Sequence, residues 1–112
     1  MWRSLGKLTV TTSGTLVRVT VNESDPAKSF QVHSLLFQAW PTNTGKIWIF
    51  SDPNGNKATG AFILAILAAP GTNVVPAASA TITDAQNALN AADYYVDADV
   101  NGESCIASYL LW

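Results

Sequence analysis

The chain has 112 residues, of which 48% are hydrophobic and 12% charged, and its net charge at pH 7 is −2. This length predicts a single domain over residues 1–112 that can bury a hydrophobic core without metal ions or disulfides. A single cysteine excludes an internal disulfide. The six Lys and Arg residues are dispersed and form no basic run, so we expect no nucleic-acid partner.

The N-terminal third predicts a β-hairpin. Residues 8–12 and 16–21 each alternate apolar and polar side chains, and Ser13 and Gly14 between them indicate a short turn. Residues 22–28 are polar and predict a loop.

The middle of the chain predicts further strands. Residues 32–40 and 46–50 are the third and fourth strands, and residues 52–56 carry the Asp, Asn and Gly residues of a turn. Residues 61–69 are apolar between Gly60 and Pro70 and predict a buried strand, since they are too few to span a bilayer. With no apolar signal core near the N-terminus, we expect a soluble chain and no membrane partner.

The next segment has weaker signals. Residues 71–79 predict a loop, residues 80–83 a short strand, and residues 84–90 a short helical stretch capped by Asp84.

The C-terminal unit predicts a second hairpin. Residues 94–100 and 103–112 flank Asn101 and Gly102, and both of these residues accept the positive φ angles of a type I′ turn. Together the elements predict an all-β fold, an antiparallel β-sandwich of about seven or eight strands, with a jelly roll as the favoured arrangement.

Two predicted strands are apolar on both faces, although a lone sandwich leaves one face of each sheet wet. Residues 46–50 place Ile47 and Ile49 on one face and aromatic side chains on the other, and residues 105–112 show a similar pattern. Chain ends are usually polar and frayed, so tryptophans near both ends indicate docking. We therefore expect a homo-oligomer, with these candidate interface residues: Trp2, Trp48, Phe50, Tyr109, Leu111 and Trp112. Packing of these strands under a long loop is the alternative.

Few side chains could support catalysis. The chain has one histidine, His33, in an apolar strand, and one cysteine, Cys105, which we expect to be a small buried apolar residue. One imidazole gives no spacing for a Ser-His-Asp triad or a zinc site. Two carboxylates could meet in space as in a glycosidase, but no local pattern supports this. We expect no enzyme activity, no catalytic residue and no cofactor.

A partial calcium-loop pattern runs from Asp97 through Asp99 to Asn101 and Gly102. The last ligand position of such a loop falls on Ser108, where a bidentate Glu is required. We therefore interpret the segment as a turn with an acidic face and expect no metal site. The aromatic residues could instead form a platform that stacks on sugar rings, although aromatic side chains more often serve cores and interfaces.

Four runs resemble small proteins of tailed bacteriophages: residues 5–10, 33–49, 65–70 and 89–103, the last reading LNAADYYVDADVNGE. The proteins that the chain resembles are virion components, and the shared motifs carry no known chemistry. The resemblance implies a viral structural protein located in the virion, assembled in the host cytoplasm.

The favoured form of this role is a capsid decoration, or cement, protein. It would bind the major capsid protein or other virion proteins as a homo-oligomer, with a trimer favoured. The alternative is a tail, baseplate or fibre component with a saccharide-binding surface, and a small glycan-active enzyme is a third class.

Overall fold

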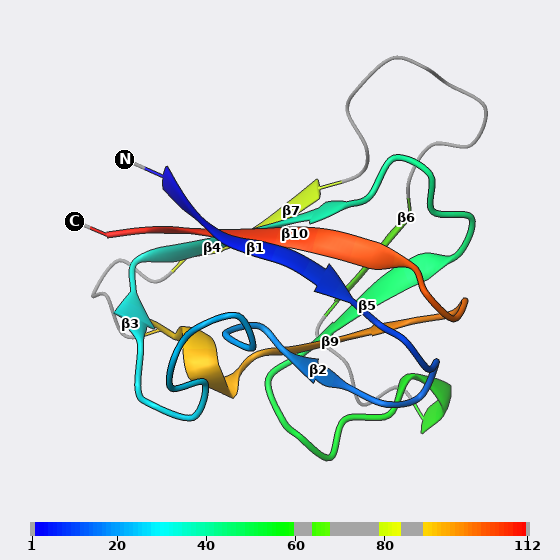
Figure 1. Ribbon diagram of the computed structural model, residues 1–112, viewed down its shortest axis with the longest axis horizontal. Coiled ribbons are helices and arrows are strands. Elements are labelled where there is room, and N and C mark those ends of the chain that lie inside the picture. Colours follow the sequence, from blue (N-terminus) through cyan, green and yellow to red (C-terminus); the bar gives the residue numbers. More distant parts are fainter. Residues whose placement is uncertain (1, 60–63, 68–78, 84–88, 112) are drawn as a thin grey trace.

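The computed structural model describes residues 2–59, 64–67, 79–83 and 89–111, and within them the chain forms antiparallel strands in two facing sheets (Figure 1). Sheet A contains, in spatial order, β1 (Trp2–Thr9), β10 (Ser104–Leu110), β4 (Ser34–Ala39) and β7 (Ser79–Thr83). Sheet B contains β2 (Val17–Arg18), β9 (Tyr95–Ala98), β5 (Lys46–Phe50) and β6 (Leu64–Leu67). β3 (Gln31–Val32) pairs with β8 (Leu89–Asn90), and η1 (Lys57–Thr59) and η2 (Ala91–Asp93) are short 3-10 helices. The predicted all-β, antiparallel fold is confirmed.

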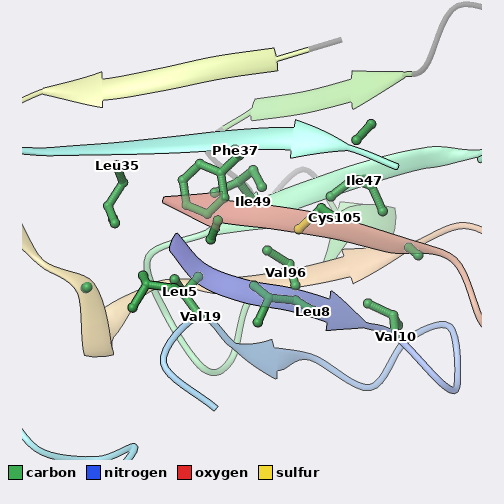
Figure 2. Packing of buried hydrophobic residues seen from close by; sticks show 14 of the residues in the cluster. Leu5, Leu8, Val10, Val19, Leu35, Phe37, Ile47, Ile49, Val96 and Cys105 are labelled. Carbon is green, nitrogen blue, oxygen red and sulfur yellow. The ribbon is translucent and has the colours of Figure 1, made fainter. Parts of the chain in front are cut away.

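The hydrophobic core lies between the two sheets (Figure 2). Side chains alternate across a strand, so every second residue of β4, β5, β9 and β10 points inward. Phe37 from β4 and Ile49 from β5 are fully buried, as is Cys105 from β10. The same alternation places the remaining residues of each strand on the outer faces of the sheets.

A bulge shapes the edge of sheet A. The register between β1 and β10 shifts between Ser4 and Gly6, and Leu5 before the shift and Leu8 after it are both buried in the core. Gly6 has a φ of 91°, and a Cβ atom there would lie 2.8 Å from the side-chain nitrogen of Asn22. That Asn22 amide donates to the carbonyl oxygens of Leu5 and Lys7 at 3.2 Å each, and so covers this part of the exposed strand edge.

The predicted N-terminal hairpin is wrong. β1 begins at Trp2 and pairs with β10, whereas β2 pairs with β9 in the other sheet. A turn does form, because the Thr15 N–H donates to the Thr12 carbonyl at 3.0 Å. This turn carries the chain from β1 in sheet A to β2 in sheet B, and the two strands lie on opposite sides of the same core.

The predicted C-terminal hairpin is also wrong as a strand pairing. Gly102 has the expected positive φ, 84°, but β9 belongs to sheet B and β10 to sheet A. The Gly102 N–H donates to the Val10 carbonyl at 2.7 Å, and the Val10 N–H donates to the Glu103 carbonyl at 2.9 Å. The turn therefore docks on the chain just after β1 instead of closing a local ladder.

The remaining predictions are confirmed in part. β4 and β5 lie within the predicted third and fourth strands, and β7 matches the predicted strand at residues 80–83. β6 falls inside residues 61–69, but Ala65 is exposed, so this strand is not fully buried. Leu89 and Asn90 form β8 instead of ending a helix, while residues 71–78 and 84–88 lie outside the described residues.

Candidate interaction surface

The outer face of sheet A carries a set of apolar side chains that are not fully buried. Trp2 lies directly opposite Leu110 in the ladder and is 43% exposed. The other members of this set are half-buried: Leu36, Trp40, Ile106 and Leu110. Serine and threonine side chains lie among them, and the Lys7 ammonium sits 4.0 Å from the centroid of the Trp40 ring. We call this set of five side chains the sheet A apolar face.

The outer face of sheet B is largely covered by the chain itself. Phe50 on β5 is only 1% exposed. Asp97 on the neighbouring strand β9, two residues after the ladder partner of Phe50, is also 1% exposed. The Gly14 N–H donates to Asp97 Oδ1 at 2.9 Å, and Lys57 Nζ lies 3.3 Å from Asp97 Oδ2. The expectation that Phe50 contacts a partner is therefore wrong, because intramolecular packing buries its side chain.

Trp48 lies on the same covered face and is half-buried. Its indole N–H donates to Asp99 Oδ1 at 2.8 Å, and the Lys46 ammonium lies 5.6 Å from its ring centroid. These contacts give Trp48 an intramolecular role.

Three of the other expected interface residues, Trp2, Tyr109 and Leu111, lie at one end of sheet A. Leu111 is 49% exposed and follows Leu110, the ladder partner of Trp2. Tyr109 is half-buried and packs edge-on against Phe30, with ring centroids 4.9 Å apart. Trp112 lies outside the described residues. We call Trp2, Tyr109 and Leu111, with Arg3 opposite Tyr109, the terminal end of sheet A.

A pocket of about 360 Å³ opens at this same end. Phe30 and Leu111 supply apolar wall, and the loop before β3 supplies Glu23, Asp25 and Lys28. The sequence gives no signal of this pocket, because residues 22–28 differ in no way from an ordinary polar loop. Only the fold brings that loop beside the end of β10.

The partial calcium-loop pattern lies next to an internal cation. The Lys57 ammonium donates to Ser13 Oγ at 2.6 Å and to the Ala98 carbonyl at 2.7 Å, and it pairs with Asp97. Asp99 Oδ1 is 3.6 Å from the same nitrogen. Among the described residues, no group of three or more His, Cys, Asp or Glu side chains could hold a metal ion. The Lys57 ammonium therefore compensates the negative charges of Asp97 and Asp99.

Calcium is therefore expected to leave the melting temperature unchanged relative to chelator. The measurement is thermal unfolding of the wild-type chain in either condition. A rise in calcium that disappears in the Asp97→Ala plus Asp99→Ala variant would contradict this prediction and establish a metal site.

The single histidine takes part in a polar contact between strands. Its Nδ1 lies 2.8 Å from the Ser34 hydroxyl, and that hydroxyl is 3.2 Å from the Thr83 hydroxyl on β7. Ser34 is only 2% exposed. A serine nucleophile has to reach its substrate, so the geometry fits a structural link between β4 and β7 better than a catalytic pair.

Cys105 is enclosed in the core. Burial raises the pKa of its thiol from the usual 9.0 to about 12. The thiolate is the reactive form, so a disulfide reagent at about pH 8 is expected to modify the folded chain far more slowly than the unfolded chain. Above pH 9 the unfolded thiol ionises first, so this group lowers the free energy of unfolding progressively between pH 9 and about 12. If the reagent labelled Cys105 in the folded chain as fast as it labels the chain in denaturant, the expected slow modification of the folded chain would be contradicted.

Comparison with protein-family models, with curated proteins and with solved structures gave no match. Among the described residues, no helix has the length and hydropathy needed to cross a bilayer.

Proposed function

We propose that this chain is a non-enzymatic virion structural protein, and in particular a capsid decoration protein that binds the assembled head as a homo-oligomer, with a trimer favoured. The observation that carries the binding role is the sheet A apolar face, where Trp2 is 43% exposed beside half-buried aliphatic side chains. Apolar side chains gathered on an accessible face are typical of interaction surfaces. The virion assignment rests on the sequence resemblance described above.

The strand order supports a jelly-roll arrangement. Without the short strands β3 and β8, the remaining strands numbered in chain order give 1-8-3-6 in sheet A and 2-7-4-5 in sheet B. This is the order of a jelly roll, a fold found in viral capsid and lectin domains. Because one fold hosts many functions, the strand order favours the proposal without defining the partner.

Decoration is a role that suits a small domain with a modest apolar surface. A closed oligomer offers several identical contacts to a symmetric shell, and their combined avidity exceeds that of one contact. A ligand that binds only the assembled shell also stabilises it by mass action. The major capsid protein is therefore the proposed partner.

Immunogold electron microscopy of purified particles tests this function. We expect label distributed regularly over the head, and co-sedimentation of the purified chain with heads in fixed stoichiometry. The Trp2→Ser plus Leu36→Ser variant is expected to reduce co-sedimentation. The Thr12→Ala variant, at an exposed turn position outside sheet A, serves as the control. Absence of label from every particle would contradict the virion role.

The second candidate is a tail, baseplate or fibre component with a saccharide-binding surface. The exposed Trp2 ring favours it, because aromatic faces stack on sugar rings. Against it, the Trp40 and Trp48 rings each already have a lysine ammonium nearby, at 4.0 and 5.6 Å from the ring centroids. Label confined to the tail, together with glycan binding that Trp2→Ser abolishes, would favour this candidate over decoration.

A further inference from the structure

Arg3 and the pocket beside Leu111 lie at the same end of the molecule. Arg3 is exposed and stands directly opposite Tyr109 in the β1–β10 ladder, so both side chains point to the same side of sheet A. Tyr109 contacts Phe30, and Phe30 lines the pocket. Arg3 itself does not line the pocket.

The charged side chains at this end of the molecule are complementary in sign. Glu23 and Asp25 line the pocket with Lys28, which leaves one net negative charge on its wall. Among the described residues, the ion pairs are those of Lys57 with Asp97 and Asp99, so neither these two pocket carboxylates nor Arg3 takes part in one. The apolar wall of Phe30 and Leu111 suits the aliphatic stem of an arginine, while the carboxylates suit its guanidinium.

We propose that Arg3 of one copy enters the pocket of a neighbouring copy, and that this contact holds the homo-oligomer together. This contact between Arg3 and the pocket rests on the self-association that the proposed function requires. Each copy presents one arginine and one pocket, so the same contact repeats from copy to copy when the copies form a closed ring. It would also bury Leu111, which is 49% exposed in the isolated chain.

Charge reversal at both sides of the contact tests this proposal by sedimentation velocity. We expect Arg3→Glu, and separately Glu23→Lys plus Asp25→Lys, to weaken self-association by about tenfold or more. The combined triple variant restores complementary charges and is expected to recover the oligomer. Lys46→Glu makes the same charge change as Arg3→Glu in the exposed first residue of β5 and should leave the oligomer intact. Thermal unfolding of each variant checks that it is folded.

The outcomes separate this contact from the proposed function. An oligomer that Arg3→Glu does not weaken, or that the triple variant fails to restore, would overturn the contact but leave self-association standing. A wild-type chain that stays monomeric at every concentration would overturn both. Mixing the Arg3→Glu variant with the Glu23→Lys plus Asp25→Lys variant distinguishes a dimer from a trimer, since every contact is restored in a mixed dimer but one contact remains repulsive in a mixed trimer.

Discussion

Replacing Lys57 with methionine is expected to lower the free energy of unfolding by about 2–3 kcal/mol. Asp97 is 1% exposed, and the substitution leaves its carboxylate with backbone donors but without its ammonium partner. Removing one member of a buried ion pair costs more than the pair itself contributes, because the remaining charge stays out of water. Lys57 is 22% exposed, which places the effect below that of a fully enclosed pair. Chemical denaturation provides the measurement.

Two further variants isolate the cause of this loss. Adding Asp97→Asn to the Lys57→Met chain removes the unpaired charge and is expected to recover part of the stability. Lys46→Met, at an exposed lysine in sheet B, is expected to have a much smaller effect. Equal losses for Lys57→Met and Lys46→Met would show that the Asp97 contact contributes little.

Deleting residues 110–112 is expected to reduce the mass of the proposed oligomer or the solubility of the chain. Leu110 pairs with Trp2 on one side and Ser34 on the other, and its carbonyl accepts the His33 N–H at 2.9 Å. The deletion therefore removes Leu111 from the terminal end of sheet A and also removes Leu110, the ladder partner of Trp2. Light scattering after size-exclusion chromatography gives the mass directly.

A single substitution separates loss of contact from loss of fold. Leu111→Ser is expected to weaken self-association while leaving the melting temperature nearly unchanged, because this side chain is 49% exposed. A truncated chain that stays folded with the wild-type oligomeric mass would refute a role for this end in assembly.

Strand positions and the core could be predicted from local alternation. Alternation predicts that Ile47 and Ile49 share one face of their strand, and both are fully buried in the core. The period of two between inward and outward side chains depends only on the strand itself. Strand partners depend on the whole chain, which is why residues around Gly14 and Gly102 form turns as expected but their flanking strands diverge into different sheets.

The candidate surface could be predicted less well than the core. Trp2 and Leu111 are exposed as an interface requires, yet Phe50 looks equally apolar in sequence and is buried. This outer face of sheet B is buried in part by contacts from distant parts of the chain, as where Lys57 and Gly14 converge on Asp97. No local pattern marks Lys57 as the partner of Asp97, because 39 intervening residues separate them in sequence.

The pairing of β1 with β10 also has a consequence for how the chain folds. These two strands come from opposite ends of the sequence, and β10 lies between β1 and β4. During synthesis β1 leaves the ribosome long before its ladder partner β10 is made. Sheet A can therefore be completed only after translation of Ser104–Leu110, and until then β1 and β4 expose unpaired edges. A topology dominated by such distant pairings folds in milliseconds to seconds, and strand edges that stay unpaired for that time favour aggregation.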